Sequence, residues 1–227
     1  MRVVIKIGGH LISDKNNILN ASYIHELLRV FNKIKEEHET IVITGGGFIS
    51  RVYIDVLREN LKNECYGDIL GIKASRLNAL LLALLMNHAS IKKIPETVEE
   101  LLALLSFHKV IFMGGLQPGQ STTTTAAIVA EAVNADLLII ATNVDGIYTE
   151  DPNLNSQAKK LDKVSIGELK QIFRDRPVKA GTYKLIDYLT INILERSKMP
   201  TIILNGNPPT NILKAIKGEK IGTKITY

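Results

Sequence analysis

The sequence has a single cysteine, Cys65, among 227 residues, so it can form no internal disulfide and offers little to a cysteine-based metal site. Such scarcity favours a reducing compartment, the cytoplasm. Long apolar runs are also missing: the longest, Leu77 to Met86, is interrupted by Asn78 and is too short to span a bilayer. The first residues read as a strand and lack the anatomy of a signal peptide. We therefore expect a cytoplasmic protein with no membrane segment.

A strong excess of charge of one sign is absent too. The chain has 28 basic and 23 acidic residues, a net charge of +5. This mild excess fits an anionic small molecule as well as nucleic acid. The basic residues form no long cluster and do not interleave with aromatic residues, as they do in RNA-recognition modules. We therefore expect no nucleic-acid partner.

Short apolar runs that read as strands alternate with segments of helical periodicity. The predicted strands cover residues 3–7, 40–44, 110–113, 137–142 and 201–204, and the helical patterns cover residues 24–34, 49–57, 77–86, 126–133 and 186–194. This alternation is typical of an α/β fold with a mainly parallel sheet covered on both faces. The best candidate for a boundary between two lobes of the chain lies near residues 133–135.

A lysine and two glycines lie at the end of the first predicted strand, in Lys6-Ile7-Gly8-Gly9-His10. Glycines let a backbone come close to a phosphate and present its N–H groups, and a lysine supplies a point charge. The alternative is an edge-strand lysine before an ordinary glycine turn. Taken alone, this loop favours that alternative.

Three consecutive glycines, Gly45, Gly46 and Gly47, follow the second strand and open the helix that contains Arg51. They place free N–H groups at the positive end of a helix dipole, where anions bind. The loop matches neither the dinucleotide-binding fingerprint nor the P-loop. Close packing of helix on strand is the alternative, but one glycine would suffice for that.

Two further loops are rich in hydrogen-bonding groups. Residues 114–125 offer glycines, amides and hydroxyls that exceed what capping the next helix requires, which suits a planar polar ligand such as a nucleobase. Residues 142–152 bring carboxylates, an amide and a tyrosine to the end of a buried strand, although Asp-Gly and Asp-Pro turns could explain them. Four such loops at one sheet edge indicate a phosphorylated ligand or a phosphoryl transfer.

With these motifs the chain resembles the amino-acid-kinase superfamily and, within it, the archaeal branch of uridylate (UMP) kinases. The likeness covers essentially the whole chain. The matching segments are residues 6–9, 45–47 with Arg51, 68–79, 114–122, 141–148 with 151–152, and 180–182 with Asp187.

The resemblance implies a three-layer α/β/α sandwich in one domain, residues 1–227, whose N-terminal lobe (about 1–134) binds UMP and whose C-terminal lobe (about 135–227) binds ATP. It implies transfer of the ATP γ-phosphoryl group to UMP in pyrimidine nucleotide biosynthesis, with Mg²⁺ carried by ATP and no metal ligand assigned to the protein. It also implies a homo-oligomer, a hexamer built from dimers. Because the two phosphate loops are adjacent, UTP is expected to inhibit competitively against UMP.

The same resemblance assigns residues to each role. Lys6 is the expected catalytic group between the two phosphates. The expected UMP-binding residues are Gly46, Asp68, Leu116, Gln117, Pro118, Gly119, Gln120, Ser121 and Thr122. The expected ATP-binding residues are Gly9, His10, Gly47, Arg51, Thr142, Asn143, Tyr148 and Asp151.

The chain departs from the family pattern at two positions. Thr123 aligns with an aspartate that in many members orients the catalytic lysine, which makes Asp187 a carboxylate of interest; its alternative role is to start a helix. His10 stands where small or hydroxyl residues are usual.

Two other functions remain open. One is a kinase of isopentenyl phosphate, carbamate or an amino acid, although isopentenyl phosphate kinases carry a histidine where this chain has residues 48–51. The other is a silent nucleotide-binding protein on the same scaffold.

Overall fold

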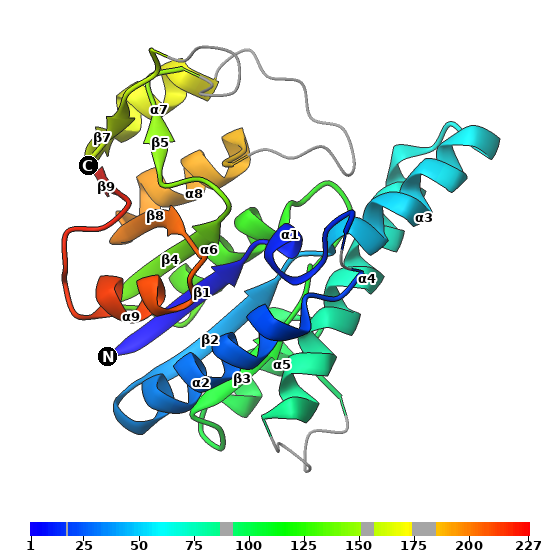
Figure 1. The fold of residues 1–227 in the computed structure, drawn as a ribbon, viewed down its shortest axis with the longest axis horizontal. Helices are drawn as coiled ribbons and strands as arrows, with labels where there is room; N and C mark the ends of the chain where they lie inside the picture. Colours follow the sequence, from blue (N-terminus) through cyan, green and yellow to red (C-terminus); the bar gives the residue numbers. More distant parts are fainter. Residues whose placement is uncertain (17, 87–92, 151–156, 174–184) are drawn as a thin grey trace.

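A computed structural model describes residues 1–16, 18–86, 93–150, 157–173 and 185–227. Within them seven strands form one sheet in the order β3-β2-β1-β4-β8-β9-β7 (Figure 1). The strands are β1 (Arg2–Ile7), β2 (Glu39–Thr44), β3 (Val110–Met113), β4 (Leu137–Thr142), β7 (Lys163–Ser165), β8 (Thr201–Asn205) and β9 (Thr223–Thr226). β5 (Ile147–Tyr148) and β6 (Lys160–Leu161) form a separate antiparallel pair. The five predicted strands are confirmed to within two residues.

Parallel pairing aligns the carboxyl ends of the four central strands. β1 pairs in parallel with β2 on one side and β4 on the other, and Lys6 lies opposite Ile43 and Ile140. β2 pairs in parallel with β3, and among the described strands of this sheet only β8 and β9 run antiparallel to each other. The loops that follow β1 to β4 therefore meet at one edge of the sheet. The β1–β4 pairing crosses the boundary near residues 133–135, and the assignment of one nucleotide to each side stays a prediction.

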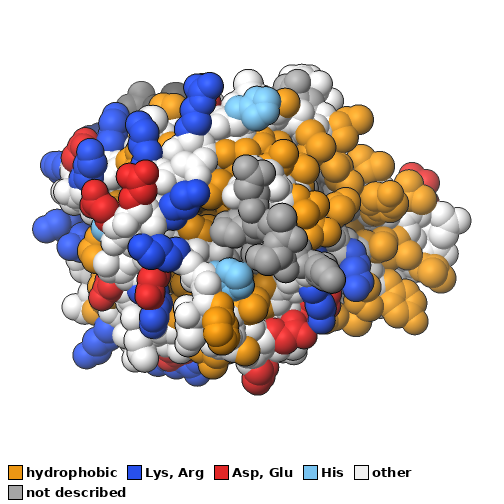
Figure 2. All heavy atoms as spheres, turned by 90° about the horizontal axis from the view of Figure 1, so that it is seen from below, with side chains coloured by type: hydrophobic (Ala, Val, Ile, Leu, Met, Phe, Trp, Pro, Cys, Tyr) orange, Lys and Arg blue, Asp and Glu red, His pale blue; other side chains and the backbone are white. Residues whose placement is uncertain are grey.

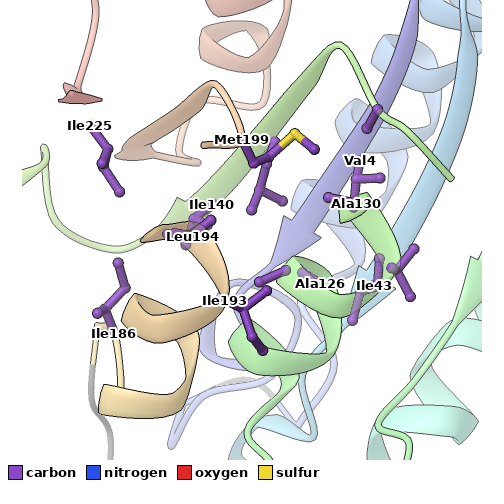
Figure 3. Close-up of a cluster of buried hydrophobic side chains, with 14 of the residues drawn as sticks. Val4, Ile43, Ala126, Ala130, Ile140, Ile186, Ile193, Leu194, Met199 and Ile225 are labelled. Carbon is purple, nitrogen blue, oxygen red and sulfur yellow. The ribbon is translucent and has the colours of Figure 1, made fainter. Parts of the chain in front are cut away.

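Helices cover both faces of the sheet and complete the predicted α/β/α sandwich. One face packs against α5 (Val98–Leu104), α6 (Thr122–Ala132), α7 (Ile166–Phe173) and α8 (Tyr188–Ser197). Figure 3 shows side chains of this core, including Val4, Ile43 and Ile140 from the strands and Ala126, Ala130 and Leu194 from the helices. The other face packs against α1 (Gly9–Ile12), α2 (Ala21–Glu37), α4 (Glu64–Leu85) and α9 (Thr210–Ile216).

Polar side chains set where most of the longer helices begin, by accepting a hydrogen bond from a free N–H of the first turn. The caps are Asn20 before α2, Asn63 before α4, Thr97 before α5, Ser121 before α6 and Asp187 before α8. None of the described helices is both long enough and apolar enough to cross a bilayer.

The apolar faces of α3 (Gly47–Asn60) and of the second half of α4 are exposed to solvent, which the sequence pattern did not predict. Both helices form, but α3 buries only Ser50 and Ile54. The face with Val52, Tyr53 and Val56 points to solvent, as do Leu77 and Leu84 on α4. Helical periodicity correctly grouped these side chains on common faces, but those faces do not meet the core.

Candidate active site

A cavity opens at the carboxyl edge of the sheet, above β1 and β2 and beside α3 and α4. Ten residues predicted to act in binding or catalysis line it: Lys6, Gly9, His10, Gly46, Gly47, Arg51, Asp68, Gln120, Ser121 and Thr122. Further lining residues are Gly45, Ser50, Ile54, Gly67, Gly71, Ile72, Gly115 and Thr123. Three of the four predicted loops therefore meet at one cavity.

The first two glycine loops pack directly on each other. A Cβ atom on Gly9 would come within 2.1 Å of the Gly47 nitrogen, and one on Gly45 within 2.6 Å of the Gly9 nitrogen. Gly47 also has φ +71°, which disfavours any side chain. Close packing thus accounts for Gly9 and Gly45, which also lie on the cavity wall. Gly46 and Gly47 likewise combine tight packing with a position on the cavity wall.

Lys6 places a buried cation at the floor of this cavity. Its side chain extends from the next-to-last residue of β1 and is only 6% exposed. Burial lowers the pKa of Lys6 to about 8, so the ammonium form still dominates at neutral pH. Among the described residues, no carboxylate forms an ion pair or hydrogen bond with it. A desolvated cation without a protein counter-charge is a strong receptor for phosphate.

His10 and Arg51 also determine which charges face this cavity. Burial, followed by the charges of Lys6 and Arg51, lowers the pKa of His10 to about 3, so its imidazole is neutral. The loop ends of β1 and β2 therefore present two fixed cations and one neutral ring to the cavity. This end of the cavity favours a multiply charged anion.

Helix α4 holds the second and third loops in place. The Asn78 amide donates to the Gly45 carbonyl at 2.8 Å, and the Gly115 N–H donates to the Ser75 hydroxyl oxygen at 2.8 Å. The Arg76 guanidinium donates to the carbonyls of Gly115 and Leu116, and it forms an ion pair with Glu96. The segment 68–79 thus holds both loops in place through hydrogen bonds.

Asp68 belongs to the same helix and connects it to the far end of the third loop. Its carboxylate accepts the Gly119 N–H at 2.9 Å, while the Gln120 N–H closes a turn onto the Gln117 carbonyl at 3.3 Å. Gly119 has φ +80°, a value suited to glycine. Leu116, Gln117, Pro118 and Gly119 are not among the lining residues of the cavity: Leu116 packs on the core and the other three are exposed.

Asp187 starts α8 and also fixes the beginning of α6. It accepts the Thr190 N–H at 2.7 Å, and its oxygens accept the hydroxyls of Ser121 and Thr124. The helix-start interpretation is confirmed, and Asp187 is not among the cavity-lining residues. Thr123, which aligns with the family's aspartate, is buried and does line the cavity.

The fourth loop lies next to the first but outside this cavity. The Gly8 N–H donates to the Ala141 carbonyl at 2.9 Å, so Thr142 and Asn143 follow directly beside the first glycine pair. Thr142 is buried, Asn143 is exposed and Tyr148 is half-buried on β5. Asp151 lies outside the described residues.

Comparison with known proteins identifies the family. A sequence model of the amino acid kinase family matches residues 1–205 of this chain. The chain belongs to the amino acid kinase family. The predicted resemblance is confirmed.

Several relatives that match nearly the whole chain are uridylate kinases. A uridylate kinase from Sulfurisphaera tokodaii is 45% identical and one from Methanocaldococcus jannaschii is 41% identical, each over 99% of both chains. The crystal structure of uridylate kinase from Archaeoglobus fulgidus matches with a TM-score of 0.84 and 38% identity, over 100% of both chains. A UMP kinase structure from Bacillus anthracis, at 20% identity, shares the fold with a TM-score of 0.81 over 99% of this chain and 95% of that one.

Some lining residues of this amino acid kinase were absent from the predicted site. Ser50 and Ile54 lie one turn from Gly46 and Arg51, and Gly71 and Ile72 lie one turn from Asp68. Helical spacing from an already predicted residue was the available signal. Asp68 is the one carboxylate among the described lining residues, and the described chain holds no group of three residues arranged to bind a metal ion.

Proposed function

We propose that this amino acid kinase phosphorylates UMP, transferring the γ-phosphoryl group of ATP to the UMP phosphate to give UDP and ADP. The observation that carries the proposal is the buried Lys6 between two glycine loops, in the same cavity as Asp68. The relatives that match the whole chain at 37–45% identity, each named uridylate kinase, support the choice of substrate.

UMP occupies the side of the cavity formed by α4 and the third loop. Asp68 is a natural acceptor for the ribose hydroxyls, since its carboxylate lies in the wall and one oxygen already orients the loop. Ile54 and Ile72 supply apolar surface for the base. The Gly46 N–H receives the phosphate, and the part of the third loop that lines the cavity, Gln120 to Thr122, contacts the base.

ATP brings its phosphates to Gly9, His10, Gly47 and Arg51, close to Lys6. Its adenosine lies over the fourth loop, on Thr142, Asn143, Tyr148 and Asp151. This arrangement assigns UMP to the N-terminal side of the chain and adenosine to the C-terminal side. It lets both reacting phosphates approach the buried ammonium group of Lys6.

The chemistry needs positioning and charge neutralisation more than proton transfer. The UMP phosphate is already ionised and requires no general base. Lys6 and the glycine-loop N–H groups stabilise the charge on the transferred group. Because the cavity wall offers one carboxylate, Mg²⁺ fits as an ion held mainly by the ATP phosphates; when bound, it neutralises charge on their oxygens.

The proposal includes assembly of identical subunits into a hexamer built from dimers. Val52, Tyr53 and Val56 on α3 continue into Ile69, Leu77 and Leu84 on α4, all exposed. Figure 2 shows hydrophobic side chains gathered over the side of the molecule where these helices lie. A patch of this kind marks an interaction surface, and a second copy offers the matching apolar face. The cytoplasm remains the proposed location.

A coupled assay of ADP release tests the proposal. UMP, CMP, dUMP and isopentenyl phosphate are offered in turn with Mg·ATP. We expect UMP to be the best acceptor by kcat/KM. Preferred turnover of isopentenyl phosphate would identify another kinase of the same fold, and nucleotide binding without turnover of any acceptor would identify a silent binding protein.

A further inference from the structure

The side chain of Gln120 leaves a polar atom without a partner in the cavity wall. Its Oε1 atom is buried, and within the described part of the chain no donor hydrogen-bonds to it. Gln120 lines the same cavity as Asp68, Ser121 and Thr122. A buried acceptor without a donor costs free energy, and native proteins leave few such atoms.

The backbone on both sides of Gln120 is fixed. On one side, the Gly119 N–H bonds to the Asp68 carboxylate at 2.9 Å, and the Gln120 N–H closes the turn onto Gln117. On the other side, the Ser121 hydroxyl caps α6 at 3.0 Å from the Thr124 nitrogen and donates to Asp187. The fold therefore fixes the backbone from which the Gln120 side chain extends into the cavity wall.

A phosphate oxygen is the wrong partner for this atom. Phosphate carries acceptors only, and the cations that attract it, Lys6 and Arg51, lie at the glycine loops. The ribose hydroxyls have the Asp68 carboxylate as a stronger acceptor. The remaining donor on UMP is N3–H of the uracil ring.

We propose that Gln120 selects the base of the acceptor nucleotide, with Oε1 accepting the N3–H of uracil. This inference rests on the proposed UMP kinase activity and adds a specificity-determining residue to it. Cytosine carries a lone pair at N3, so the same oxygen would face an acceptor and disfavour CMP. A site that hydrogen-bonds a substrate group rejects an analogue without it, because a buried polar atom then stays unpaired.

Two variants separate the role of the acceptor from the role of side-chain volume. Gln120→Leu keeps much of the volume and removes the acceptor, and Gln120→Glu keeps an oxygen acceptor. Each is assayed for kcat/KM with UMP, CMP and 3-methyl-UMP, which lacks the N3–H. The KM for ATP and the melting temperature serve as controls for folding.

For Gln120→Leu we expect kcat/KM for UMP to fall roughly tenfold, mainly through KM, while CMP is unchanged or improved. Gln120→Glu should keep the preference for UMP over CMP, and the wild type should reject 3-methyl-UMP. A UMP-to-CMP ratio within threefold of wild type in Gln120→Leu, or a reversed preference in Gln120→Glu, would overturn the inference. Wild-type enzyme that fails to phosphorylate UMP would instead overturn the proposed function, so the two failures are distinguishable.

Discussion

The Asn78 side-chain amide donates to the main-chain carbonyl of Gly45 at 2.8 Å, so the middle of α4 holds the first glycine of the second loop. Asn78 is buried, and the Gly45 N–H in turn donates to the Ile7 carbonyl at the end of β1. The Asn78 side chain thereby connects α4 to β1 and β2, the strands that precede the first two glycine loops.

Replacing Asn78 by alanine should destabilise the protein by about 1–3 kcal/mol, because the Gly45 carbonyl is left without its buried donor. Urea unfolding gives this difference directly. Asn60→Ala is the matched control: the Asn60 amide also donates to a main-chain carbonyl, that of Val56, but on the exposed surface of α3. The control should stay within about 0.5 kcal/mol of wild type. Equal losses of stability in the two variants would show that the buried hydrogen bond to Gly45 contributes no more than the exposed one.

Asp68→Asn should weaken UMP far more than ATP. Hydrogen bonds to a charged group contribute roughly 1.5–3 kcal/mol, so we expect the Kd for UMP to rise about tenfold or more while the Kd for ATP changes little. Isothermal titration calorimetry with each nucleotide measures both constants. Asp162→Asn, a change at an exposed carboxylate that pairs with Lys160 and Lys220, should leave both unchanged. Equal weakening of the two nucleotides by Asp68→Asn would reject the placement of UMP beside α4.

UTP should inhibit competitively against UMP. Its base and ribose would take the Asp68 side of the cavity and direct the β- and γ-phosphates toward Lys6, where we propose that the γ-phosphate of ATP lies. Initial rates at several UTP concentrations, with UMP varied to saturation, test this. If the plateau rate falls even at saturating UMP, and calorimetry finds both nucleotides on one subunit, UTP has a site of its own.

Val56→Asp should disrupt the proposed subunit contact. Val56 is 57% exposed in the middle of the apolar face of α3, so a charge there costs little in a lone subunit and much inside an interface. Light scattering after size exclusion should show smaller assemblies than wild type. Leu189→Asp, at an exposed apolar residue of α8, is the control for adding the same charge elsewhere. An unchanged mass for Val56→Asp would remove α3 from the interface.

The sequence predicted the strands and loops well because they depend on local signals. Apolar runs located β1 to β4, and parallel pairing then required their loops to share an edge. The solvent exposure of the apolar face of α3 could not be predicted, because periodicity shows which residues share a face but not what covers that face. The contacts of Asn78 and Ser75 with the glycine loops join residues about 30 to 40 positions apart, and no local pattern encodes them.

The buried ammonium group of Lys6, which we propose to be catalytic, also lowers the stability of the folded protein. Because burial lowers the Lys6 pKa from 10.5 to about 8, the folded state disfavours its charge by about 3 kcal/mol at pH values where both the folded and the unfolded states are protonated. This penalty is complete below pH 8, and stability should rise as pH increases from 8 toward 10.5, where the unfolded chain binds more protons. Lys6→Met should therefore raise the melting temperature at pH 7 and flatten this rise.

The most direct test of the account is turnover and UMP binding by Lys6→Met in parallel. The account predicts a kcat at least about a hundredfold below wild type, the scale of losing one transition-state donor, with the Kd for UMP nearly unchanged and a melting temperature no lower than wild type. Turnover within a few-fold of wild type would contradict it and would make Lys6 a structural residue.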